Sequence, residues 1–310
     1  MTRRNTIRAS LGPQIMALDF VAAQPLLEMT MPTAALPMGG DLAISGTDVR
    51  VERGQRFAEV RGIAIMPIRG ILTANCEMYE QWLGWATYAG IEAVCGELQA
   101  RDDIQALVIE ADSPGGLVLG QEAASMSIAA LARIKPVHVI VSPLAASAAY
   151  WLVSQATEIS AAPGSVVGSI GVMRESAWPV QPNEDGDQWG VHLSSHARSK
   201  APNPTSDIGL AQIQRELDSA EARFLAAVSA GRGIPLDDLM TALSSTEDQA
   251  DGGGYFMPDD ALARGLIDRI ETRSEFYARV FGLYAPVPKK PAASRAYHAA
   301  AVAAQAAARP

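Results

Sequence analysis

Ser147 is the residue of this sequence whose neighbours best fit a catalytic nucleophile. A serine hydrolase needs a hydroxyl in a fixed position, a base to take its proton, and donors for the developing oxyanion. Ser147 follows an apolar stretch and opens a helical pattern, and Ala148 and Ala149 leave room for a substrate backbone. Amides at a helix start, beginning with Ala148, would lie near the hydroxyl. At such a position an N-cap serine is the more frequent role, so further residues must decide.

A pair of glycines is the second candidate feature. Residues 113–116 (SPGG) follow another apolar stretch. Because neighbouring parallel strands end at the same edge of a sheet, this turn should lie beside Ser147. Consecutive glycines allow their amides to approach a ligand closely. We therefore expect an oxyanion hole formed by Gly116, Gly115 and the amide of Ala148. An ordinary turn between a strand and a helix is the alternative.

Histidine is the usual general base, and the chain contains four. His138 lies inside an apolar stretch, where a neutral and hydrogen-bonded role in the core is expected. His298 lies in the C-terminal tail. His192 and His196 stay open as weaker candidates for the base.

Lysine is the alternative base, because arginine remains protonated in proteins. Lys289 and Lys290 lie in the tail, and Lys135 precedes a strand at the end away from Ser147. Lys200 remains, although a solvated surface lysine is the more frequent fate. A lysine base acting near pH 8 needs its pKa lowered from about 10.4 by about two units, which burial can supply. Ser169 is the candidate hydroxyl that would aim the amine, unless it belongs to a simple turn.

Alternating strands and helices must position these residues. Apolar stretches predict strands at 57–69, 104–111, 136–141 and 157–161, and helical spacing predicts helices at 79–99, 119–133, 145–155, 207–231 and 259–264. Strands that alternate with helices favour right-handed crossovers and a parallel sheet, which is an α/β fold.

Composition limits the classes of function. The 310 residues carry a net charge of −9 and are 48% hydrophobic, which favours a globular protein that does not bind nucleic acid. Two cysteines, Cys76 and Cys95, favour a reducing compartment without a disulfide framework or zinc cluster. We expect no cofactor, no metal, no membrane span and no secretory signal. The organisation expected is an N-terminal arm (1–45), one domain (46–284) and an Ala/Pro-rich tail (285–310).

Four segments together resemble peptidase family S49 over about residues 58–282: 112–116 (DSPGG), 146–151 (ASAAYW), 168–172 (GSIGV) and 261–268 (ALARGLID). The resemblance implies a ClpP/crotonase-like α/β fold with a Ser–Lys dyad. Ser147 matches the nucleophile, Lys200 the general base, Ser169 the serine that hydrogen-bonds the lysine, and Gly116 the oxyanion glycine. The family more often has glycines at positions 148 and 149, where this chain has alanines.

Residues 199–207 (SKAPNPTSD) are similar to the phage head-maturation branch of the family. That branch implies protein substrates, namely scaffold and capsid proteins, with the chain itself as a further candidate. It also implies a homo-oligomer that works in the bacterial cytoplasm or within the procapsid.

Four alternatives to a phage maturation protease stay in view. A bacterial peptide hydrolase related to signal peptide peptidase A would use the same dyad. A ClpP-type Ser-His-Asp protease would need a histidine within residues 165–180, which contain none. A crotonase-type acyl-CoA enzyme would need neither Ser147 nor Lys200. A catalytically silent capsid-assembly component would lack proteolysis altogether.

Overall fold

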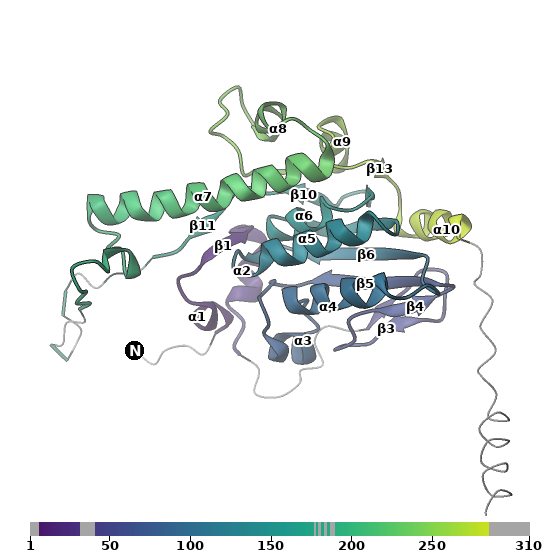
Figure 1. Ribbon diagram of the computed structural model, residues 1–310, viewed down its shortest axis with the longest axis horizontal. Coiled ribbons are helices and arrows are strands. Elements are labelled where there is room, and N and C mark those ends of the chain that lie inside the picture. Colours follow the sequence, from purple (N-terminus) through teal and green to yellow (C-terminus); the bar gives the residue numbers. More distant parts are fainter. Residues whose placement is uncertain are drawn as a thin grey trace, which may run out of the picture.

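An eight-stranded, mostly parallel sheet forms the centre of the computed structural model, which describes residues 6–31, 41–176, 178, 181–182, 185–186 and 190–284 (Figure 1). Its strands are β4 (Ala58–Val60), β5 (Ile63–Arg69), β6 (Ala106–Ser113), β8 (Val137–Ala146), β9 (Glu158–Ala161), β10 (Val166–Gly168), β12 (Tyr255–Phe256) and β13 (Arg269–Ile270). Their order is β12-β10-β8-β6-β5-β4, and β9 joins β8 and β13.

The central strands are parallel and buried on both faces. β5 pairs with β6, and β6 with β8, both in parallel, while β4 and β12 pair antiparallel at the two ends. Nearly all side chains of β6 are buried, as expected of a parallel sheet covered by helices. The expected α/β class, a parallel sheet with flanking helices, is confirmed.

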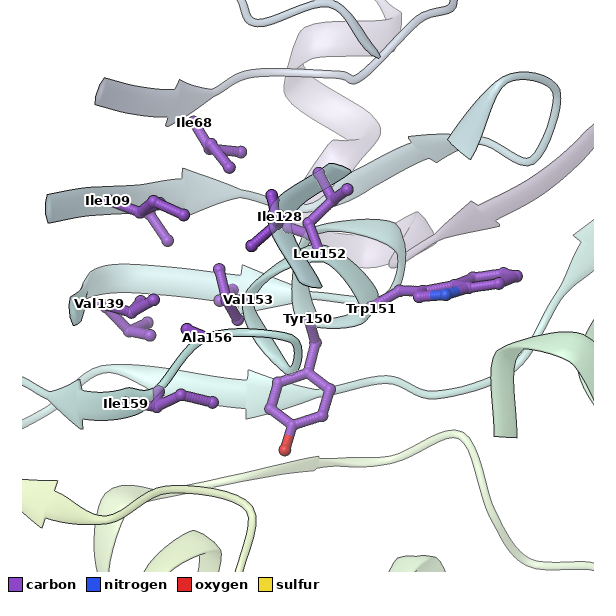
Figure 2. Close-up of a cluster of buried hydrophobic side chains, with 14 of the residues drawn as sticks. Ile68, Ile109, Ile128, Val139, Tyr150, Trp151, Leu152, Val153, Ala156 and Ile159 are labelled. Carbon is purple, nitrogen blue, oxygen red and sulfur yellow. The ribbon is translucent and has the colours of Figure 1, made fainter. Parts of the chain in front are cut away.

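Helices cover both faces of this sheet. Figure 2 shows Ile109 of β6 and Val139 of β8 in one buried cluster with Leu152 and Val153 of α6 (Ala148–Val153). The same core takes in α4 (Tyr88–Gln99) and α5 (Gln121–Ala132). On the other face, α10 (Arg273–Leu283) packs its aromatic side chains against Val108 and Ile140.

Two of the expected elements differ most clearly from the prediction. The helix expected at 79–99 is two helices, α3 (Glu77–Leu83) and α4, because Gly84 takes a left-handed conformation and ends α3. The strand expected at 136–141 continues as β8 to Ala146, since the residues beyond its polar break at Ser142 pair with β10.

The long helix α7 (Asp207–Arg232), expected at 207–231, buries one apolar stripe. Ile213, Ala220, Phe224 and Val228 are buried, and Figure 1 shows α7 passing α6 and extending beyond the sheet at its N-terminal end. The Phe224 ring stacks on Trp151 of α6 at 4.5 Å between centroids. This stack fixes α7 to the helix that follows Ser147. None of the helices in the described ranges is both long and apolar enough to span a bilayer.

The N-terminal arm is packed against the domain rather than extended from it. It forms α1 (Ile7–Leu11), β1 (Ile15–Leu18) and α2 (Phe20–Leu27), which share an apolar cluster with Ile71, Trp85 and other residues of the domain. The sequence predicted an arm here, but it did not predict the strand. The tail (285–310) lies outside the described residues.

The Trp151–Phe224 stack can be tested by stability measurements. Phe224→Ala should lower the free energy of unfolding by about 3–5 kcal/mol, because the ring is fully buried and leaves a cavity. Arg223→Ala, one position earlier on the exposed face, should change the free energy by less than about 0.5 kcal/mol. Urea denaturation followed by far-UV circular dichroism measures both, and equal effects would contradict the assigned packing.

Candidate active site

Parallel pairing of β6 and β8 brings the two sequence features together. Ser113, the last residue of β6, lies opposite Ala145 of β8. Residues 113–116 therefore lie beside Ser147, which directly follows β8. The neighbourhood expected from strand order is present in the structure.

The backbone of Ser147 has an unusual conformation. Its φ is 54° and its ψ is −121°, and its side chain makes no cap hydrogen bond to α6. A left-handed conformation is uncommon outside glycine and costs free energy, so it persists where the surroundings impose it, often at functional sites. The Ser147 amide donates to Gly168 O at 2.7 Å, and Oγ donates to Gly171 O at 3.4 Å. The hydroxyl is therefore turned away from the role of a helix cap.

Gly115 and Gly116 have different roles, and Gly115 makes room for the neighbouring backbone. The amide of Gly115 donates to Ser113 Oγ at 3.1 Å, and that hydroxyl donates to Gly70 O at 2.6 Å. The Gly115 amide is thus engaged within the turn, which counts against its expected part in an oxyanion hole. Gly115 instead supplies space, since its φ is +102° and a Cβ there would lie 3.0 Å from the Ala148 amide nitrogen.

Gly116 packs against a neighbouring backbone. A Cβ on Gly116 would lie 2.0 Å from Leu72 O, and Leu117 N donates to that same oxygen at 2.9 Å. Gly116 also pairs with β1 on its other side. With the Gly115 amide engaged by Ser113, the amides of Gly116 and Ala148 remain as the candidate oxyanion donors.

Ser169 lies next to this arrangement. Its φ is 51°, and its amide donates to Gly254 O at 2.7 Å. Ser169 and Gly171 line an open cavity of about 590 Å³ together with Glu221 of α7. Burial raises the pKa of the Glu221 carboxyl, and the nearby Asp218 adds to the rise.

Lys200 is the one member of the expected site that the structure does not place beside Ser147. It ends a short 3-10 turn (Arg198–Lys200), its side chain is exposed, and its amide donates to Ala197 O at 2.9 Å. Within the described ranges, its amine has no hydrogen bond to Ser147 or Ser169. Figure 1 shows the segment 190–206 beyond the N-terminal end of α7, away from the sheet.

The other candidate bases are accounted for. His138 is buried, and its ring nitrogens contact Glu158 Oε2 at 3.1 Å and Tyr284 Oη at 2.6 Å. Burial lowers the pKa of His138, so the structural role expected for it is confirmed. His192 and His196 are exposed on the same segment as Lys200. In the part of the chain that is described, no three His, Cys, Asp or Glu residues are grouped as a metal site.

Reasoning from sequence missed one neighbour of the site. Strand β1 lies between β11 (Met173–Arg174) and β7 (Gly115–Leu117), so residues of the arm contact the glycine pair directly. Four apolar residues between Pro13 and Asp19 are too short a signal to predict a strand or its partners.

Comparison with known proteins assigns the family. Residues 129–282 match the model of peptidase family S49, and this range contains Ser147, Ser169 and Lys200. The chain belongs to peptidase family S49. The match spans β8, α6 and α7, the elements that surround the candidate nucleophile.

Three curated relatives are consistent with S49 membership. Capsid assembly protease C of Escherichia phage lambda is 26% identical over 219 residues, covering 68% of this chain and 50% of that protein. Protease 4 of Haemophilus influenzae is 31% identical over 234 residues, covering 72% and 35%. Head-tail preconnector protein GP5 of Enterobacteria phage P21 is 29% identical over 257 residues, covering 80% and 49%. The chain thus spans a third to a half of the length of these relatives.

Close backbone contact at Gly116 in this S49 chain can be tested with two alanine variants. Gly116→Ala should lower the free energy of unfolding by more than about 1 kcal/mol, because its Cβ would overlap Leu72 O. Gly96→Ala in α4, where a Cβ meets nothing within 4 Å, should raise stability by about 0.5–1 kcal/mol. Thermal and urea denaturation measure both changes, and a neutral Gly116→Ala would contradict the contact.

Proposed function

We propose that this chain is a serine endopeptidase with a Ser–Lys dyad, in which Ser147 is the nucleophile and Lys200 the general base. The observation that carries the proposal is the left-handed backbone of Ser147 at the end of β8, beside the glycine pair. That conformation holds a hydroxyl away from its own helix at the edge of a parallel sheet, where such folds bind ligands.

The proposed reaction follows from the positions of these groups. Ser147 Oγ attacks the peptide carbonyl while the neutral amine of Lys200 takes its proton. The amides of Gly116 and Ala148 stabilise the negative oxygen of the tetrahedral intermediate. Lysine then donates the proton to the departing amine, and water hydrolyses the acyl-enzyme by the reverse sequence. Ser169 is proposed to accept a hydrogen bond from the lysine and aim it.

Lys200 must come close to Ser147 for this chemistry. Either the segment 190–206 moves in its own chain, or a second copy of the chain supplies the lysine. The exposed position of Lys200 beyond the N-terminal end of α7 favours the second copy. The expected homo-oligomer would then complete each site.

Scaffold and capsid proteins are the proposed substrates, with the chain itself as a further one. The names of two relatives, a capsid assembly protease and a head-tail preconnector protein, support a role in phage head assembly. The similarity to Protease 4 supports the second candidate, a cellular peptide hydrolase with the same dyad. Cleavage of co-expressed capsid or scaffold protein distinguishes the two, as does a gene position beside portal and capsid genes.

The dyad predicts a defined pattern among four variants. Ser147→Ala should lower kcat/KM for a fluorogenic peptide at least about a thousandfold. Lys200→Arg should do the same, because it keeps the charge but cannot accept a proton. Arg198→Lys, a matched exchange in the same turn, should retain activity. Activity of Ser169→Ala should fall less than that of Ser147→Ala, because Ser169 only positions the base.

A pH profile checks the base independently. Activity of the wild type should rise with pH through an alkaline limb, because only the neutral amine accepts the proton. A profile that is flat from about pH 6 to 10 would contradict a lysine base, since the free amine of lysine has a pKa of about 10.4. Full activity of Ser147→Ala on a thioester would favour an acyl-CoA enzyme instead.

Mixing two inactive variants tests how Lys200 reaches the site. Ser147→Ala and Lys200→Ala proteins should together regain activity, because an intact lysine of one copy can serve an intact serine of another. Assays of the mixture after co-refolding, against each variant alone, measure the recovery. No recovery would assign Lys200 to its own chain, after movement of segment 190–206.

A further inference from the structure

Strand β1 of the arm lies antiparallel between two segments of the candidate site. Ala17 is opposite Gly116 of β7, and Met16 is opposite Met173 of β11. β1 therefore completes a three-stranded sheet. Its strand β7 begins at Gly115, close to the Ala148 amide, and its strand β11 begins two residues after Gly171, whose carbonyl accepts from Ser147 Oγ. The arm thus fills the strip between β7 and β11, beside Ser147.

The register places a carbonyl of the arm on the Gly116 amide. Val118 N donates to Ile15 O at 3.0 Å, and Asp19 N donates to Pro114 O at 2.8 Å. In antiparallel pairs, hydrogen-bonded and non-hydrogen-bonded positions alternate. Ala17 and Gly116, which lie midway, are therefore a hydrogen-bonded pair in which the Gly116 amide donates to Ala17 O.

The same carbonyl lies close to the second candidate donor. A Cβ on Gly115 would be 2.3 Å from Ala17 O and 3.0 Å from the Ala148 amide nitrogen. The absence of a side chain on Gly115 is what lets this carbonyl approach. Ala17 O thus lies near both amides that are the candidate oxyanion donors.

Two residues of β1 line cavities near this point. Leu18, which is 4% exposed, lines the cavity of about 590 Å³ that also contains Ser169 and Glu221. Ile15 lines a larger open cavity of about 820 Å³ with Val118 and Trp151. Extended peptides are recognised at sheet edges by main-chain pairing, with pockets beside the strand giving specificity for side chains.

We infer that the strip between β7 and β11 is the peptide-binding groove and that residues 15–19 of the same chain occupy it in place of a substrate. This inference rests on the proposed peptidase function. The ligand class is an extended peptide with apolar side chains three positions apart, as in Ile15 and Leu18. Because β1 must leave before a substrate binds, the apparent affinity for peptide is reduced by the fraction of molecules with an open groove.

Release of β1 can be tested by peptide binding. A fluorescein-labelled peptide of residues 14–19 is titrated against full-length Ser147→Ala protein, which cannot hydrolyse it, and anisotropy gives the affinity. Adding Leu18→Asp should tighten binding at least about tenfold, since a carboxylate in the cavity beside Glu221 expels the strand. Adding Val21→Asp, on a residue 76% exposed in α2, should change nothing.

Locking β1 provides the opposite test. Ile15 lies opposite Arg174 in a non-hydrogen-bonded pair, a spacing that suits a disulfide. In the Ser147→Ala protein, the added pair Ile15→Cys/Arg174→Cys should abolish peptide binding when oxidised and restore it when reduced. Thr6→Cys/Thr30→Cys, across a bridge inside the arm, is the matched disulfide and should bind equally in both states.

The outcomes separate this inference from the proposed function. If folded Leu18→Asp binds the peptide no more tightly, or the oxidised lock binds as well as the reduced form, the groove assignment is overturned. Circular dichroism of each variant shows whether it is folded. If the peptide binds as expected but the Leu18→Asp protein with an intact Ser147 cleaves no peptide, the groove assignment is supported and the proposed peptidase function is wrong.

Discussion

Parallel pairing of β6 with β8 is the interaction on which the rest of the site depends. It brings the ends of two strands to one edge of the sheet, so that residues 113–116 and Ser147 meet although a helix separates them in sequence. The pairing is stable because both faces of these strands are buried beneath helices. A buried scaffold of this kind can hold the unfavourable backbone of Ser147 in place.

Small residues determine how close a peptide backbone can come. Gly115 and Gly116 approach Ala17 and Leu72 at distances that a side chain would prevent. At Gly116 the absence of a side chain also leaves the amide facing the strip that β1 fills. Close packing of the turn and recognition of a peptide carbonyl therefore have one structural cause.

The arm joins the core and the site through two kinds of contact. Its helices share an apolar cluster with the domain, and its strand adds main-chain hydrogen bonds to the sheet edge. Burial of apolar surface favours docking of the arm but does not fix its position along the domain. The main-chain hydrogen bonds of β1 fix the register of Ala17 on Gly116. Together they hold one short segment in the groove at high local concentration, as a tether does.

Sequence alone determined the local parts of this protein. Apolar runs predicted β6 and the first half of β8, helical spacing predicted α7, and residue chemistry pointed to Ser147. These features depend on near neighbours along the chain. The tertiary structure decided the left-handed backbone of Ser147, the engagement of the Gly115 amide by Ser113, and the exposed position of Lys200. It also decided the place of β1, because its pairing joins residues about a hundred positions apart, and no local pattern records which distant strand edge is open.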